Sequence, residues 1–283
     1  MDTTDDPCEH VESHGRDGEL LTAVRHGGQV LGWRPAGGDG DGDGNGDRLW
    51  LSPLADCGPG SAVRGGVPVI FPQFSARGPL PRHGLVRDRP WDDVRVGPEG
   101  AALRMVVRDD EAGRRVWPHR FRLELTALAE GARLRLELAV HNEGTEPFDF
   151  TAALHAYLRV ADADRCTLLG VGGLPVESNA APGRAVPLPP GPMAVGGPLD
   201  VAVRGCRGPV VLHDPVLGDL SLATTGFADV VVWNPGRGAE PADVPDGHSA
   251  RFVCVEPAVL DPVLLPPGGS WTGTATWTTA NRT

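Results

Sequence analysis

Lysine is absent from this sequence, so all 26 basic residues are arginines. The 37 acidic residues outnumber them and give a formal net charge of −11. A chain this acidic lacks the extended basic surface on which nucleic acids bind. The composition therefore argues against nucleic acid as a partner.

Long apolar runs and paired cysteine motifs are absent as well. No run approaches the roughly 18 residues of a membrane span, so we expect no membrane partner. The N-terminal residues are acidic and contain no apolar segment, so we also expect no secretory signal. The five cysteines are an odd number without CxxC spacing, which argues against a disulfide framework and a zinc ribbon. A soluble, cytoplasmic protein is the simplest expectation.

Helical periodicity is also missing, whereas a period of two recurs. Leu134, Leu136 and Leu138 alternate with charged residues, residues 120–126 alternate in the same way, and a turn near Gly131 joins the two segments. With 39 glycines and 28 prolines to form turns, this pattern predicts an all-β fold, an antiparallel sandwich or barrel. Further strands are expected at 20–25, 29–33, 103–108, 150–160, 209–213, 229–233 and 251–256.

The chain shows no internal boundary and no repeat. We expect residues 1–18 to form a disordered acidic tail and residues 19–283 to form one β domain. Residues 37–47 alternate glycine with aspartate and superficially suggest a calcium loop. The twelfth position of such a loop requires glutamate, but it is Trp50 or Ser52 here. A flexible hairpin loop is the better interpretation.

Residues 64–91 are unusually rich in glycine, proline and arginine. Between residues 60 and 95 six arginines face three aspartates, which reverses the acidic balance of the chain. Glycine and proline hold irregular backbone in fixed turns, and guanidinium groups are well suited to phosphate or carboxylate. The segment predicts a site for a small anion. The alternative is a solvated basic loop.

Two further segments carry candidate catalytic side chains. Alternation within 150–160 puts His155 on one face with Tyr157, the only tyrosine of the chain. Glu256 ends a strand whose same face carries Cys254, and such partial burial makes a carboxylate a better base. An imidazole and a carboxylate are the minimal set for moving protons at two oxygens of one small molecule. The alternatives are a surface or hydrogen-bonded histidine and a surface glutamate at a strand end.

Several motifs together resemble those of the aldose 1-epimerase superfamily, specifically its hexose-6-phosphate branch. They occur in family order over roughly residues 20 to 277, nearly the whole chain. The motifs are Leu-Trp-Leu-Ser (49–52), Arg-Gly-Gly-Val-Pro (64–68), Phe-Pro-Gln-Phe (71–74), Pro-Arg-His-Gly-Leu-Val-Arg (81–87), Ala-Leu-His-Ala-Tyr-Leu-Arg-Val (153–160), Trp-Asn-Pro (233–235) and Phe-Val-Cys-Val-Glu (252–256).

The resemblance implies a galactose-mutarotase-like β-sandwich whose concave face binds a sugar. It implies that Glu256 takes the proton of the anomeric hydroxyl while His155, as imidazolium, protonates the ring oxygen. The ring then opens, the aldehyde rotates, and reclosure gives the other anomer. The same resemblance implies no metal and no organic cofactor, and we expect a monomer.

By the same resemblance Arg64 and Arg87 hold the 6-phosphate, His83 contacts the sugar, and Gln73 contacts a ring hydroxyl or the phosphate. The expected substrate is therefore a hexose 6-phosphate, with glucose 6-phosphate the first candidate. A neutral aldose offers nothing that needs two guanidinium groups. An unphosphorylated aldose is the alternative substrate.

The sequence departs from the family at residues 173–178, where many relatives carry Gly-Leu-x-Tyr-x-Asp. Neither the tyrosine nor the substrate-contacting aspartate is present, and Glu177 is the candidate replacement. This departure supports a second hypothesis, a non-catalytic carbohydrate-binding or sugar-sensing sandwich. A glycosidase needs two carboxylates, and only one acidic residue, Glu256, has a persuasive setting.

Overall fold

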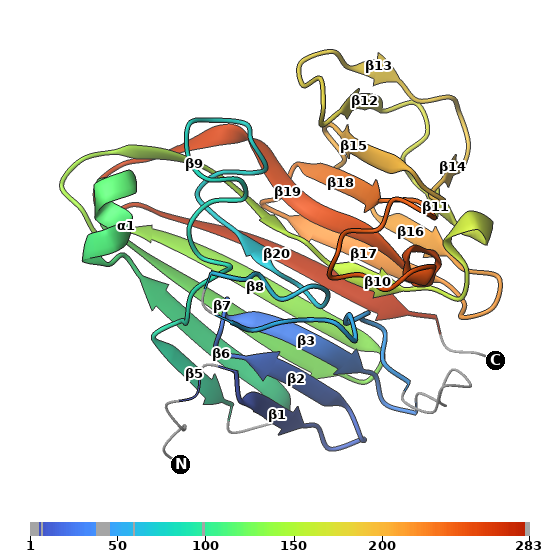
Figure 1. Ribbon diagram of the computed structural model, residues 1–283, viewed down its shortest axis with the longest axis horizontal. Helices are drawn as coiled ribbons and strands as arrows, with labels where there is room; N and C mark the ends of the chain where they lie inside the picture. Colours follow the sequence, from blue (N-terminus) through green and yellow to red (C-terminus); the bar gives the residue numbers. More distant parts are fainter. Residues whose placement is uncertain (1–5, 7, 38–45, 59, 98–99, 281–283) are drawn as a thin grey trace.

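The computed structural model describes residues 6, 8–37, 46–58, 60–97 and 100–280, and in them the chain forms antiparallel β-sheets (Figure 1). The one α-helix in these ranges is α1 (Glu111–Val116), and the 3₁₀ turns are η1 (Ala163–Arg165) and η2 (His248–Arg251). None of these helices has the length and apolar character to cross a membrane. The predicted all-β fold is confirmed. Most of the glycine–aspartate loop predicted at 37–47 lies outside the described residues.

A nine-stranded sheet forms one layer of the molecule (Figure 1). Its strands, from one edge to the other, are β14 (Met193–Ala194), β11 (Thr167–Leu169), β16 (Val210–His213), β17 (Leu220–Thr225), β20 (Ser270–Thr279), β8 (Arg133–Asn142), β7 (Phe121–Glu130), β6 (Ala101–Arg108) and β5 (Asp93–Val96). Along β7 and β8 every second side chain is buried. The predicted hairpin of these two strands is therefore confirmed.

An eight-stranded sheet carries the residues of the candidate site. Its strands run in the order β13 (Val186–Pro187), β12 (Pro175–Ser178), β15 (Leu199–Val203), β18 (Asp229–Asn234), β19 (Phe252–Leu265), β9 (Phe148–Leu154) and β4 (Val69–Ile70), and β10 (Tyr157–Arg159) also pairs with β19. Its strands come from both halves of the chain. Residues far apart in sequence therefore become neighbours on it.

The third sheet consists of β1 (His10–His14), β2 (Leu20–Val24) and β3 (Gln29–Arg34) and packs against β5 and β6. The disordered tail predicted for residues 1–18 is therefore wrong for β1, whose polar residues obtain their order from pairing with β2. Residues 1–5 and 7 lie outside the described residues. The cysteine count argued against a disulfide framework, and the described residues contain a single bridge, between Cys8 and Cys57, 49 positions apart, which the sequence did not predict.

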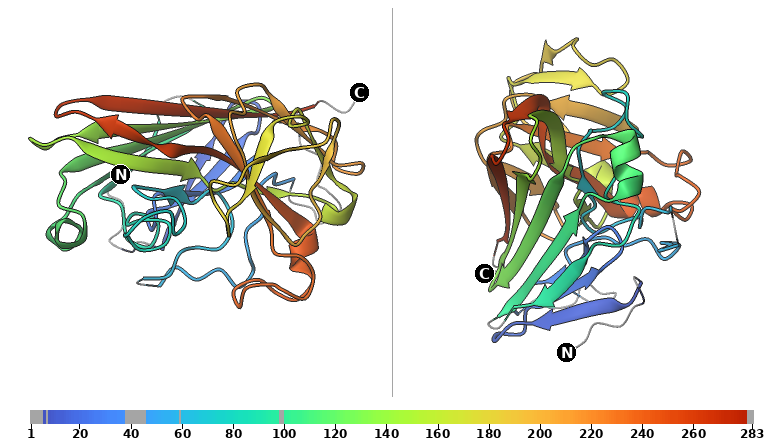
Figure 2. Two further views of the ribbon diagram at one scale, coloured as in Figure 1. Left: turned by 90° about the horizontal axis from the view of Figure 1, so that it is seen from above. Right: turned by 90° about the vertical axis from the view of Figure 1, so that its left-hand side faces the viewer.

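One contiguous apolar core contains residues from all three sheets. Trp33 of β3, Leu125 of β7 and Val255 of β19 belong to it, and each is almost completely buried. The opposite face of the eight-stranded sheet is covered by loops instead. In Figure 2, left, the loops of residues 71–91 (light blue to teal) and 235–247 (orange) project on the same side of the sheets. The candidate site lies beneath these loops.

The predicted strand 150–160 is interrupted between β9 and β10, and the sequence of β19 explains why. The Val255 N–H donates to the Ala156 carbonyl at 3.2 Å. Pro257, two residues further along β19, faces the same neighbouring segment but has no N–H to donate. The Leu154 carbonyl accepts instead from the Ala156 N–H at 2.9 Å. Pro257 thus permits a local bend at His155.

Strand β19 itself continues through Pro257, although the sequence predicted that it ends there. Its ladder with β18 runs from Asp229–Ala258 to Trp233–Cys254, so the proline removes no bond from that side. On the other side the register shifts between Val259 and Val263. Strand β19 therefore tolerates a residue without an N–H, because Pro257 faces the gap between β9 and β10, where no ladder hydrogen bond is needed.

Candidate active site

The register of the eight-stranded sheet places the site residues on its outer face. Ala153 of β9 lies opposite Ala258, and Tyr157 of β10 lies opposite Cys254, so the two pairings share one register. Continuing that register across the bend puts His155 opposite Glu256. Since alternate residues of a strand share a face, Cys254 and Glu256 point to the same side. The predicted pair therefore meets across neighbouring strands.

The basic segment covers this face as a tightly turned loop. Gly84 has a φ of 82°, and a Cβ there would lie 2.0 Å from the Phe71 carbonyl oxygen, so only glycine fits. His83 is also in the left-handed region, with φ 67°. Its N–H donates to the Ser75 carbonyl at 3.0 Å. A non-glycine residue held in this region is characteristic of ligand-binding segments.

Arg64 is held from two sides. Its Nε donates to Asp243 Oδ2 at 3.0 Å, and its Nη1 donates to the Tyr157 hydroxyl at 2.7 Å. The Tyr157 ring in turn stacks on the His155 ring, with centroids 4.9 Å apart and planes 12° from parallel. Tyr157 therefore connects the guanidinium of Arg64 to the imidazole of His155. The predicted common face of His155 and Tyr157 is confirmed.

A cavity of about 270 Å³ lies between the loops and the sheet. His155 and Glu256 both line it, as do Arg64, His83 and Arg87. The remaining lining residues are Phe74, Ser75, Arg82, Asn179, Asp200, Val231, Trp233 and Pro241. Arg82 and Arg87 form no ion pair within the described ranges. Two of the three guanidinium groups at this cavity therefore have no internal counter-ion there.

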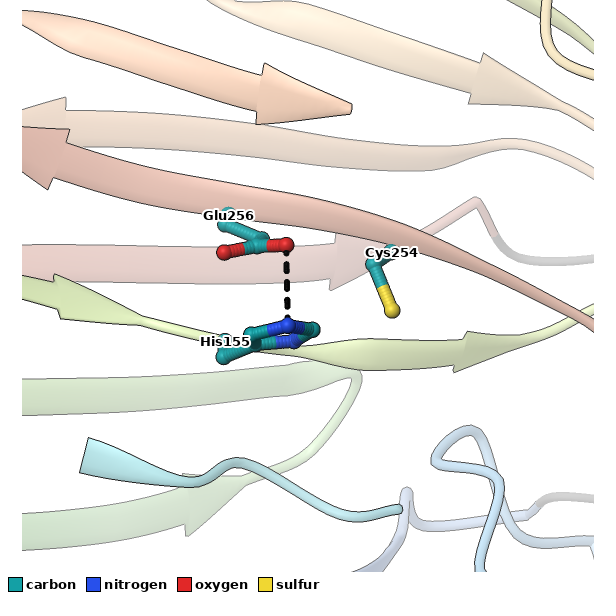
Figure 3. A group of neighbouring side chains, drawn as sticks. All are labelled: His155, Cys254 and Glu256. Carbon is teal, nitrogen blue, oxygen red and sulfur yellow. Dashed lines mark ion pairs between the residues drawn. The ribbon is translucent and has the colours of Figure 1, made fainter. Parts of the chain in front are cut away.

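The imidazole and the carboxylate are in direct contact (Figure 3). The distance from His155 Nε2 to Glu256 Oε1 is 3.3 Å, and the Glu256 side chain is 1% exposed. His155 Nδ1 and Glu256 Oε2 are buried and have no hydrogen-bond partner among the described residues. Unsatisfied polar atoms at such depth are costly, so we read them as atoms prepared for a ligand.

The environment drives the two pKa values apart. Burial lowers the pKa of His155 well below its ordinary value, and His83, Arg64 and Arg87 lower it further. Burial raises the pKa of Glu256 well above its ordinary value, and the charge of Asp200 adds to this. In the substrate-free site the proton therefore favours the carboxyl group over the imidazole. The imidazolium expected from the sequence is thus disfavoured before substrate binds.

His83 is neutral for the same reasons. Burial lowers its pKa to about 3, assisted by the charges of Arg87, Arg82 and Arg64. The Ser75 N–H points to His83 Nδ1 at 3.4 Å. A neutral ring whose Nδ1 accepts carries its hydrogen on Nε2. His83 therefore offers the cavity an uncharged polar group.

Two of the residues singled out in the sequence do not line the cavity. The Gln73 amide donates to the carbonyls of Ser75 and Leu80 and accepts from the Leu80 N–H, so it holds the loop and does not face the cavity. Gln73 therefore has a structural role in the loop, and its contact with substrate stays a prediction. Glu177 forms ion pairs with Arg77 and Arg204 at 2.8 and 3.3 Å. It does not take the place of the missing aspartate.

Asp200 was missed by the sequence analysis. It lies opposite Trp233 on β18, on the same outer face, and both line the cavity. Asn179 lines the cavity as well. Its Nδ2 donates to Asp200 Oδ1 at 2.6 Å, and its Oδ1 accepts from Arg77, so hydrogen bonds hold the side chain in place. Asp200 follows a proline- and glycine-rich segment without a motif. Only the strand register identifies it.

The fold and the comparisons with known proteins define an isomerase, of the class that interconverts sugar anomers. The chain belongs to the aldose 1-epimerase family, whose sequence model matches residues 10–277. The fold is galactose-mutarotase-like, and the substrate is a small-molecule sugar.

Similar proteins come from a plant and from bacteria. The chain is 29% identical over 262 residues to a "Putative glucose-6-phosphate 1-epimerase" of Cenchrus ciliaris, covering 88% of this chain and 78% of that protein. It is 31% identical over 239 residues to an Escherichia coli protein of the same name, covering 82% and 77%. A Salmonella typhimurium crystal structure described as "a putative mutarotase" superposes with a TM-score of 0.85 at 27% identity, over 99% of this chain and 92% of that one.

Proposed function

We propose that this enzyme interconverts the α and β anomers of a hexose 6-phosphate, with glucose 6-phosphate as the first candidate. One observation carries the proposal: Arg64, Arg82 and Arg87 line the same cavity as the His155–Glu256 pair. A phosphate dianion accepts charge-assisted, bidentate hydrogen bonds from guanidinium groups. The relatives named above support the same substrate.

The proposed chemistry needs one proton donor and one acceptor. Glu256 removes the proton of the anomeric O1 hydroxyl while His155 protonates the ring oxygen O5, and the C1–O5 bond breaks. The open aldehyde rotates about C1–C2. The reverse transfers then close the ring on the other face. Both oxygens are bonded to C1, so two side chains in mutual contact can serve them together.

Substrate binding supplies the protonation state that this scheme requires. Arg64 and Arg87 are among the charges that lower the pKa of His155. A phosphate dianion on these guanidinium groups offsets their positive charge. The His155 pKa then rises, and the proton moves from Glu256 toward the imidazole. An unphosphorylated aldose lacks this charge and is the weaker substrate in this scheme.

A binding module without turnover remains the second candidate, since residues 173–178 lack the family's aspartate. Asp200 supports the enzyme, because it provides a cavity carboxylate from a different strand. The unsatisfied atoms His155 Nδ1 and Glu256 Oε2 also favour the enzyme over the binding module. A pure binder gains nothing from a buried proton donor and acceptor that no neighbour satisfies.

The experiment is an anomerisation assay that starts from pure α-glucose 6-phosphate, with α-glucose measured in parallel. We expect acceleration over the uncatalysed rate with the phosphorylated sugar. His155→Asn and Glu256→Gln should each lower kcat by about 10²–10⁴-fold, the usual contribution of a positioned proton transfer. Binding of glucose 6-phosphate without acceleration would favour the binding module. Unchanged rates in both variants would refute the assigned roles.

A further inference from the structure

Next to the cavity, but outside its lining, lies a third buried side chain that the proposed reaction does not use. Cys254 lies two residues before Glu256 on β19, and its thiol is on the same side of the strand (Figure 3). Ligand atoms of Cys254, His155 and Glu256 all lie within 4.8 Å of one another, and all three residues are buried. Cys254 itself does not line the cavity. Its thiol therefore lies immediately behind the catalytic pair.

From this arrangement we propose that the active site binds one Zn²⁺ ion through Cys254 Sγ, His155 and Glu256, and that the ion inhibits the enzyme. Thiolate, imidazole and carboxylate are the three ligand types that zinc uses in proteins. A site with three protein ligands keeps a fourth position open. Here the open position would be on the side of the cavity, through which the ion enters.

The separations suit a tetrahedral ion after a small adjustment. Zinc bonds of about 2.0–2.3 Å put neighbouring ligand atoms roughly 3.3–3.6 Å apart. The His155–Glu256 distance of 3.3 Å already matches that spacing. The largest separation in the group, at most 4.8 Å, needs to shorten by about one ångström. Rotation of the Cys254 side chain about its Cα–Cβ bond can supply a movement of this size.

Unsatisfied atoms supply a second observation that points to a ligand. His155 Nδ1 and Glu256 Oε2 have no hydrogen-bond partner among the residues described, and both side chains are about nine-tenths buried or more. Imidazole and carboxylate can each present either of their two ligand atoms to an ion. An ion held by His155 Nδ1 or Glu256 Oε2 would therefore give a partner to an atom that has none here. Among the described residues, the one polar partner that either side chain has is the other member of the pair.

Charge balance decides which cation fits. When the ion binds, the thiol and the carboxyl group release their protons to solvent, and one thiolate and one carboxylate neutralise two positive charges. A neutral cluster can remain buried, whereas an uncompensated ion cannot. The arginines around the cavity repel hard cations such as Mg²⁺, which prefer oxygen ligands and retain water. The thiolate bond compensates that repulsion only for a thiophilic ion.

The test is calorimetric titration of the chelator-treated protein with ZnCl₂ and no sugar. We expect one equivalent to bind. Cys254→Ala should weaken binding at least about 100-fold, because even the outer hydrogen-bond partners of metal ligands contribute roughly 10–100-fold. The matched control is Cys206→Ala, another free and buried cysteine, which should bind as the wild type does. Cys254→Ser provides a second variant of similar size in case the alanine variant folds poorly.

Cobalt provides a spectroscopic readout of the thiolate. Wild type and Cys206→Ala should show a thiolate-to-cobalt charge-transfer band with Co²⁺, and both Cys254 variants should lack it. Absence of zinc binding by the wild type, or binding undiminished in both Cys254 variants, overturns the proposal.

Inhibition is measured separately and rests on the proposed function. Anomerase activity of the wild type should fall in step with zinc occupancy, return on chelation, and remain unaffected by Mg²⁺. Zinc occupancy without loss of activity overturns the inhibitory role. Because the calorimetric and cobalt measurements need no substrate, failure of the zinc site and failure of the proposed reaction remain distinguishable.

Discussion

Two buried glutamates on the outer face of the same sheet behave in opposite ways. Glu177 on β12 accepts hydrogen bonds from Arg77, Arg204 and the Gly183 N–H. Glu256 on β19 has a single polar contact, to His155, and leaves Oε2 unsatisfied within the described chain. Burial alone would raise both pKa values. The pKa of Glu177 is nevertheless lowered by its cationic partners, whereas that of Glu256 is raised.

The difference separates structure from function. A buried carboxylate with all its partners present contributes to a fixed fold, and its proton does not move in ordinary conditions. A buried carboxyl group with one partner is expensive for the fold and ready to exchange a proton. Glu177 also acts at a distance, because Arg77 donates to Asn179, which holds Asp200 at the cavity. The hydrogen-bond network around Glu177 thus helps to position Asp200 at the cavity that Glu256 lines.

The largest effects should come from making the same substitution, glutamate to glutamine, at each of the two positions. Glu256→Gln should remove nearly all activity while leaving the free energy of unfolding unchanged or higher, because a poorly satisfied buried acid is removed. Glu177→Gln should lower the free energy of unfolding by about 3 kcal/mol, the low end for breaking a buried ion pair. Arg204 retains Asp229 as a partner, which limits the loss. Urea unfolding and kcat of the folded protein are the measurements, and similar profiles for both variants would remove the distinction.

The dependence of stability on pH sharpens the contrast. Because the folded-state pKa of Glu177 is lowered from an ordinary value of 4.5, its contribution is complete above that value. It is lost as the pH falls through the lowered folded-state pKa. The wild type should therefore lose stability relative to Glu177→Gln below about pH 4.5. Parallel urea midpoints of the two proteins between pH 6 and roughly pH 3 would argue against this account.

An intermediate effect on KM is expected from the arginines that line the cavity. Arg87→Met should raise the KM for glucose 6-phosphate about 10–100-fold, since hydrogen bonds to charged groups contribute about 1.5–3 kcal/mol. The KM for unphosphorylated glucose should remain unchanged. Arg89→Met is the matched control, because Arg89 pairs with Asp110 and does not line the cavity. An equal rise for both sugars would place the phosphate elsewhere.

The smallest effect should come from the link between the arginine and the histidine. Tyr157→Phe removes the hydroxyl that accepts from Arg64 but keeps the ring stacked on His155. We expect KM for the sugar phosphate to rise about fivefold, equivalent to roughly 1 kcal/mol. The kcat should change less than twofold, which steady-state kinetics can resolve. A loss mainly in kcat would instead mean that the hydroxyl takes part in proton transfer.

Much of the fold could be predicted from alternation alone. Strands β7 and β8 were readable because leucines occupy every second position and the opposite positions are charged or small. Strand β20 was missed, because threonine fills its alternate positions and only Gly273, Ala275 and Trp277 are buried. Strand β1 was missed for a related reason. Its polar residues order only by pairing with β2.

The sequence by itself determined the types of chemical group. It identified an arginine-rich turn segment, an imidazole and a carboxylate on strands, because residue type and alternation are local properties. Tertiary structure alone decided which of these groups meet. The shared register across β9, β10 and β19 brings His155 to Glu256, and strand pairing puts Asp200 at the cavity and Glu177 among arginines. Long-range pairing depends on the packing of the whole core, which no short stretch of sequence specifies.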